Sequence, residues 1–80
     1  MARYNIGLVL FEQGSYQKAI ESFEETLKMN PQFTAAVFKI GQSFLKLGKE
    51  DKAKEKFREY LVKVPNGEMA LQAKAHLAKR

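Results

Sequence analysis

The chain has 80 residues and a net charge of +5, so it makes one small domain whose basic character is compatible with acidic partners and with nucleic acid. It contains no cysteine, which excludes disulfides and thiolate metal sites and fits the cytosol and the periplasm alike. No apolar run approaches the ~20 residues of a membrane span, and the longest lacks signal-peptide flanks, so we expect a soluble protein without membrane insertion.

The first predicted helix covers residues 2–13 and ends at Gly14, because glycine readily adopts the left-handed conformation that closes a helix. Ser15 is suited to cap the next helix through its hydroxyl. That second helix is predicted over residues 16–29, where apolar residues recur at spacings of three and four. Pro31 ends it, because the residue before a proline is disfavoured in the α region.

The same order of signals then returns. The third predicted helix covers residues 33–47 and ends at Gly48, and the fourth covers residues 50–64 and ends at Pro65. An alanine-rich fifth helix runs from Gly67 or Glu68 to residue 79.

A shift of 34 residues relates the two halves. It pairs residues 1–33 with residues 35–67, and 11 of these 33 pairs are identical, where composition alone gives about two or three. A unit of this length cannot bury its apolar face alone, so such units stack into a solenoid that presents a surface. The recurring motif residues are Gly7, Gly14, Ala19, Phe23, Leu27 and Pro31, which return as Gly41, Gly48, Ala53, Phe57, Leu61 and Pro65.

Residues 6–11 form an apolar run that could be a buried strand. The repeat favours a helix, since the equivalent residues 40–45 interrupt the run with two polar residues. Gly7 and its counterpart Gly41 therefore lie inside helices, each at a cost of about 1 kcal/mol relative to alanine. Because this unfavourable glycine occurs at the same position of both repeats, we expect close contact between the two helices of each hairpin. Ala19 would lie against Gly7, and Ala53 against Gly41.

The motif residues resemble the tetratricopeptide repeat, a helix-turn-helix unit with a bulky-then-Gly pair, a Gly at the turn, an Ala and an aromatic in the second helix, and a Pro between repeats. The resemblance covers nearly all of the chain. It implies an all-α, right-handed solenoid of two repeats, residues 1–33 and 34–67. Residues 68–80 would be a capping helix or the first helix of a partial third repeat, and we expect this single domain to be a fragment of a longer chain.

Departures from the family pattern are local. Glu50 and Lys54 replace the apolar Tyr16 and Ile20 of the first repeat, which predicts a more exposed second hairpin. Residues 64–67, together with the alanine-rich helix that follows, also resemble the C-terminal tetratricopeptide regions of bacterial envelope proteins that accompany the Tol-Pal system.

The resemblance implies that the first helices of successive repeats line a concave groove, whose aromatic, basic and amide side chains suit a bound peptide. We expect a non-catalytic protein-protein interaction module, a scaffold or adaptor, whose partner is a protein or peptide, with an acidic one as an option. The candidate groove residues are Tyr4, Asn5, Leu8, Phe11, Phe38, Lys39, Gln42, Lys46, Met69, Gln72 and His76.

An alternative interpretation makes Tyr4, Leu8 and Phe11 packing residues at a self-association interface or beside a missing neighbour. Val9 supports this alternative, because its counterpart Ser43 belongs to the face of the third helix that meets the second. The chain would then be a homo-oligomer held together by its first helix.

The Lys/Asn clamp of tetratricopeptide domains that grip the acidic C-termini of chaperones is not matched. Tyr4 and Leu8 stand where a lysine and an asparagine are needed, Lys39 replaces another asparagine, and Met69 and Ala73 replace basic residues. Chaperone carboxylate binding is accordingly disfavoured, since the charge-assisted donors are missing.

The sequence predicts no enzyme, cofactor or metal site. His76 is the only histidine, and no Asp, Glu or Cys stands at ligand spacing from it in the sequence. The glutamates lie on helix surfaces, where Glu59 and Lys63 are predicted to pair across one turn. Phosphate-binding loops and nucleophile motifs do not occur.

Electrostatic nucleic-acid binding is a third, disfavoured alternative. Residues 1–33 carry a net charge of −1, residues 34–67 carry +4 and residues 68–80 carry +2. The basic side chains alternate with acidic ones and lack interleaved aromatic platforms. They are Lys46, Lys49, Lys52, Lys54, Lys56, Arg58, Lys63, Lys74, Lys79 and Arg80.

Overall fold

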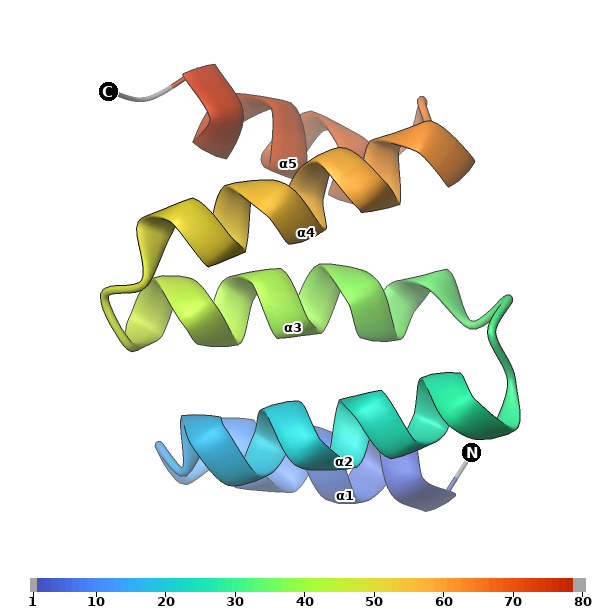
Figure 1. The fold of residues 1–80 in the computed structure, drawn as a ribbon, viewed down its shortest axis with the longest axis vertical. Helices are drawn as coiled ribbons and strands as arrows, with labels where there is room; N and C mark the ends of the chain where they lie inside the picture. The colour runs from blue at the N-terminus through green and yellow to red at the C-terminus, as the bar shows by residue number, and fades with distance from the viewer. Residues whose placement is uncertain (1, 79–80) are drawn as a thin grey trace.

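The computed structural model describes residues 2–78, which form an all-α helical-repeat solenoid. Each helix packs on the next one along the chain, and the stack runs from α1 and α2 at one end to α5 at the other (Figure 1). The helices are α1 (Ala2–Glu12), α2 (Tyr16–Met29), α3 (Thr34–Lys46), α4 (Glu50–Lys63) and α5 (Glu68–Ala78). The predicted fold class is confirmed, and residues 6–11 are helical. Lys79 and Arg80 of the predicted basic set lie outside the described residues.

Backbone hydrogen bonds close the turn between α1 and α2. Gly14 has a φ of +84°, its N–H donates to the Phe11 carbonyl at 3.0 Å, and the Ser15 N–H donates to the Leu10 carbonyl at 2.9 Å. The same pair of bonds ends α3 at Gly48, where φ is +79°. These bonds satisfy carbonyl groups at the end of α1, whereas the Ser15 hydroxyl makes no cap hydrogen bond at the start of α2, so the predicted side-chain cap is wrong.

Two apolar clusters form the core, and each is built around the phenylalanine of one repeat motif. Phe23 and Phe57 are both 0% exposed, and burial of each ring contributes about 1.5–3 kcal/mol. Leu27 and Phe44 contact both clusters and so join them. The buried members are Ala19, Ile20, Phe23, Ala36 and Ile40 in one cluster, and Val37, Phe38, Ala53, Phe57, Tyr60, Ala70 and Ala73 in the other.

The helical glycines make room for these phenylalanine rings. A Cβ atom on Gly7 would lie 2.5 Å from Cε1 of Phe23, and one on Gly41 would lie 2.8 Å from Cε1 of Phe57. The three atoms nearest to the Cβ on Gly7 all belong to the ring of Phe23, one helical turn further along α2 than Ala19, whose predicted contact with Gly7 stays a prediction. Each glycine lowers the helix propensity, but it lets a phenylalanine ring pack directly on the helix backbone, which offsets that cost.

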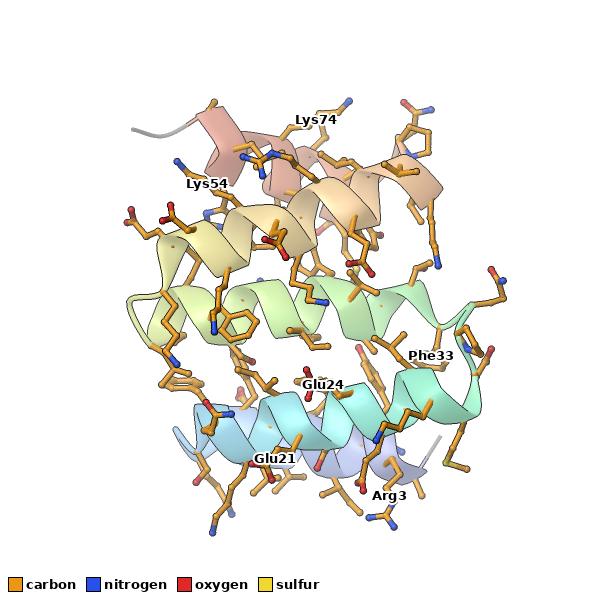
Figure 2. The ribbon with its side chains drawn as sticks, in the orientation of Figure 1. Arg3, Glu21, Glu24, Phe33, Lys54 and Lys74 are labelled. Carbon is orange, nitrogen blue, oxygen red and sulfur yellow. The ribbon has the colours of Figure 1, made fainter. Side chains whose placement is uncertain are left out.

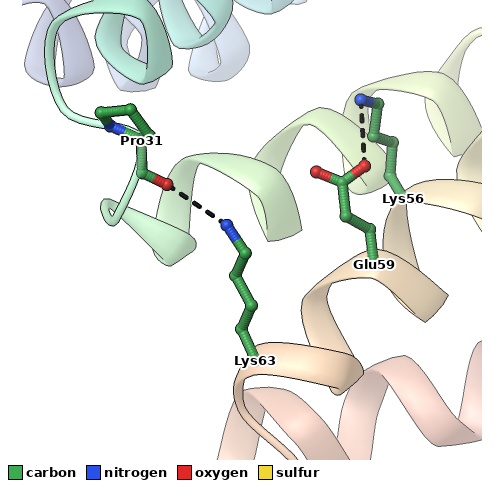
Figure 3. Close-up of polar contacts among 4 residues, drawn as sticks. All are labelled: Pro31, Lys56, Glu59 and Lys63. Carbon is green, nitrogen blue, oxygen red and sulfur yellow. Dashed lines mark hydrogen bonds and ion pairs between the residues drawn. The ribbon is translucent and has the colours of Figure 1, made fainter.

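The polar contacts of α4 differ from the predicted pairing. Nζ of Lys63 donates to the Pro31 carbonyl oxygen at 3.4 Å, which links the end of α4 to the turn between α2 and α3 (Figure 3). Glu59 accepts instead from Nζ of Lys56 at 3.5 Å (Figure 3). The predicted Glu59–Lys63 pair is therefore wrong, because both side chains bond elsewhere.

Candidate functional site

Two neighbouring hollows follow the face formed by the first helices of the hairpins and by α5. The lysine hollow has a volume of about 510 Å³ and is lined by Phe11, Lys39, Gln42, Leu45, Lys46 and His76. The turn hollow has a volume of about 520 Å³ and is lined by Phe38, Lys39, Gln42, Tyr60, Val64, Asn66, Gly67, Glu68, Met69 and Gln72. Since both hollows share Lys39 and Gln42, they form one continuous surface, which we call the concave groove.

Most of the residues predicted for the groove come together in it. Residues from α1, α3 and α5 meet there although they are far apart in the sequence, because the 34-residue repeat places equivalent helices on one side of the stack. The predicted residues that line the groove are Phe11, Phe38, Lys39, Gln42, Lys46, Met69, Gln72 and His76.

Tyr4, Asn5 and Leu8 line neither hollow. The ring of Tyr4 lies 4.8 Å from that of Phe33 and 5.6 Å from that of Phe23, centroid to centroid, and burial raises the pKa of its phenol. Leu8 packs against the same cluster, whereas Asn5 is exposed. The first part of α1 therefore serves mainly to attach this helix to α2 and to Phe33, which Figure 2 shows between α2 and α3.

The floor of the groove is aromatic. Phe38 is only 2% exposed, and its ring lies 5.5 Å from that of Phe57 and 5.4 Å from that of Tyr60. His76 stacks on the other side of the same cluster, with its ring 5.0 Å from Phe57 and 10° from parallel. Phe38 thus supports the groove from below and offers little surface to a ligand.

Lys39 connects α3 to α1 at the rim of the lysine hollow. Its Nζ lies 5.3 Å from the centroid of the Phe11 ring, a cation–π contact that holds the ammonium over the hollow. Lys46 lies in the last turn of α3 and is exposed. The lining of this hollow contains no carboxylate, whereas Glu68 brings one to the turn hollow.

Gln42 occupies the centre of the groove and brings both a donor and an acceptor to it. Its Oε1 atom is buried and finds no hydrogen-bond partner within residues 2–78. A buried polar atom without a hydrogen-bond partner destabilises the protein, so a ligand that donated a hydrogen bond to this oxygen would be stabilised.

The end of α4 and the following turn bring further residues to the groove, which the sequence pattern does not predict. Tyr60, Val64, Asn66, Gly67 and Glu68 line the turn hollow. The family pattern implies a groove lined by first helices, and these residues belong to a second helix and to a turn. The Pro-Asn-Gly sequence before α5 signals a tight turn and could have indicated this contribution.

The outer face of α1 is a second candidate surface. Ile6 is 46% exposed and Val9 is 56% exposed, while their counterparts Ile40 and Ser43 in α3 are both 0% exposed. The Ser43 hydroxyl donates to the Lys39 carbonyl at 2.9 Å, which satisfies it inside the core. In α3 this face packs against α2, whereas in α1 it meets no equivalent helix of the described chain.

Among residues 2–78, no group of three or more His, Cys, Asp or Glu side chains is placed to hold a metal ion. None of the five described helices combines the length and apolar character needed to span a bilayer.

Comparison with known proteins supports the repeat assignment. A family model of the tetratricopeptide repeat matches residues 2–68, which include α1 to α4 and the first residue of α5. A search of curated proteins finds no significant match. The likeness of residues 64–67 to envelope proteins of the Tol-Pal system stays a prediction.

Proposed function

Since the chain belongs to the tetratricopeptide repeat family, whose repeats generally mediate protein-protein interactions, we propose that it is a non-catalytic module that binds a peptide segment of a partner protein in the concave groove. One observation supports this most: the two hollows join through Lys39 and Gln42 into a surface lined by residues of four helices, α1, α3, α4 and α5. The module would act as a scaffold or adaptor within a larger protein or assembly.

The chemistry of the groove suits a peptide. Aromatic and aliphatic side chains offer apolar contact area, and the amides of Gln42 and Gln72 can pair with peptide N–H and C=O groups. The buried ring of Phe38 gives this surface a rigid floor. Binding to such a preformed surface requires little reorganisation of the module.

A peptide-display selection against the immobilised chain tests the proposal. Gln42→Trp fills the centre of the groove, and Glu21→Trp adds the same bulk on α2 as a matched control. Enriched peptides should bind the wild type and the Glu21→Trp control alike and lose about tenfold or more of their affinity for Gln42→Trp. Peptides that bind all three proteins equally would contradict use of the groove.

Self-association through α1 is a second candidate function, favoured by the exposure of Ile6 and Val9. The equivalent positions in the other repeat are buried. Removing these exposed aliphatic side chains from water by association lowers the free energy through the hydrophobic effect. Sedimentation velocity at several concentrations should then show a dimer that Ile6→Lys and Val9→Lys dissociate. A monomer at every concentration would remove this candidate.

A further inference from the structure

We propose that the lysine hollow binds an acidic segment, in which a carboxylate side chain lies next to an apolar one. This inference rests on the proposed function and specifies the chemistry of the peptide in the groove. It depends on Lys39, Lys46, Gln42 and Phe11, and none of these residues reproduces the clamp pattern that the chaperone-binding members of the family use.

The positive charge of the lysine hollow is not neutralised. Lys39 and Lys46 both line it, and within residues 2–78 neither has a carboxylate oxygen within 4.0 Å of its Nζ. The contact found for Lys39 is with the ring of Phe11, which leaves its ammonium group free to meet an anion. Partial burial of Lys39 strengthens such an ion pair relative to one in water.

A hollow on α2 provides a contrast within the same molecule. Its volume is about 440 Å³, and Lys18 and Lys28 line it together with Glu21, Glu24 and Glu25. Figure 2 shows Glu21 and Glu24 on α2. The glutamates there neutralise the lysines, so a carboxylate that binds gains little electrostatic attraction. The charged residues that line the lysine hollow are positive only.

The remaining lining favours a peptide over a small free anion. Phe11 and Leu45 supply apolar walls beside the two ammonium groups, and the Gln42 amide lies between this hollow and the next. A carboxylate alone would use the lysines and leave the walls in water. An acidic residue flanked by an aliphatic or aromatic one engages both, and its main chain can reach Gln42.

Nucleic acid fits this hollow less well. The ammonium group of Lys39 lies over the ring of Phe11, so a base that stacked on that face of the ring would have to displace it. Figure 2 shows Lys54 and Lys74 projecting from α4 and α5 at the far end of the stack, and neither residue lines the lysine hollow. A phosphate backbone would therefore meet separate lysines instead of one continuous row.

Fluorescence anisotropy with two labelled peptides tests the inference at pH 7.5 and low salt. The acidic probe is Gly-Asp-Leu-Asp-Phe-Glu-Gly, and the neutral probe replaces each acid by its amide, Gly-Asn-Leu-Asn-Phe-Gln-Gly. We expect the acidic probe to bind about tenfold or more tightly than the neutral one. Lys39→Gln with Lys46→Gln should abolish that preference, while the matched pair Lys18→Gln with Lys28→Gln, which removes the same charge from α2, should keep it.

The outcomes separate this inference from the proposed function. Equal affinity for the two probes, or an acidic preference that survives loss of Lys39 and Lys46, would overturn the acidic specificity and leave groove binding intact. If neither probe binds while peptides from the display selection do, the acidic inference alone fails. Displacement of the acidic probe by a thymidylate octamer at equal concentration would overturn the inference in favour of nucleic acid.

Discussion

The two hairpins share a motif, yet equivalent residues in them have different environments. Ile40 in α3 is 0% exposed and Ile6 in α1 is 46% exposed, and buried Val37 corresponds to the surface residue Arg3, which pairs with Glu25 at 3.4 Å. The helix α3 packs against both α2 and α4, whereas α1 packs mainly against α2. The motif therefore determines how each hairpin closes, and the neighbouring helices determine which of its side chains become core.

Loss of the motif phenylalanine should have the largest effect. Phe57→Ala should lower the free energy of unfolding by about 3–5 kcal/mol, because the ring contacts both Phe38 and His76 and its removal leaves a cavity between three helices. Phe23→Ala should cost less, since α1 can move into the space. Urea unfolding followed by circular dichroism measures both values, and equal losses would contradict the difference between the hairpins.

The aliphatic counterparts Ile40 and Ile6 give a second comparison of the same kind. Ile40→Ala should cost about 2–5 kcal/mol because the side chain is fully buried, and Ile6→Ala should cost less than about 1 kcal/mol. The same unfolding assay applies. A large loss for Ile6→Ala would indicate that its face is already covered in solution, as self-association predicts.

The glycines sharpen the comparison further. Alanine at Gly41 should cost about 1–2 kcal/mol, because its Cβ would press on the fixed ring of Phe57 and the gain in helix propensity offsets only part of that. Gly7→Ala should cost less although Phe23 is nearer, since α1 is held on fewer sides. Thermal unfolding of the two variants tests the ranking, and a greater loss for Gly7→Ala would contradict it.

Tyr4 differs from its counterpart Phe38 in having a group that ionises. Burial raises the pKa of Tyr4 above 10.0, so the folded state favours the neutral phenol. Its contribution to stability is complete below pH 10 and is lost as the pH rises through the folded pKa, because the unfolded chain releases the proton first. Tyr4→Phe should therefore lose less stability than the wild type between pH 8 and pH 11. Equal losses in urea unfolding at the two pH values would contradict this.

The sequence predicts the helices to within about one residue, because glycine and proline stop signals repeat with the motif. The contact of Ala19 with Gly7 stays a prediction, and periodicity alone does not show that the ring of Phe23, one turn further along α2, comes nearest to a Cβ on Gly7. The predicted ion pair between Glu59 and Lys63 does not form. Helical spacing permits that pair, but the nearby Pro31 carbonyl offers Lys63 another partner.

The sequence predicts the groove less completely than the helices. The family pattern brings Lys39, Gln42 and His76 to one surface because they occupy first-helix positions. It cannot show that Phe38 is buried, since that follows from the packing of α4 and α5 around the ring. Nor does it include Asn66, which the α4–α5 turn adds to the groove.

A nuclear magnetic resonance titration of the isotope-labelled chain with a peptide from the display selection tests the central claim most directly. If the concave groove is the binding surface, the largest changes in amide signals will occur at Lys39, Gln42, Met69 and Gln72, which line the two hollows. Changes concentrated on Ile6 and Val9, or on α2, would show that the partner binds elsewhere and would contradict the account.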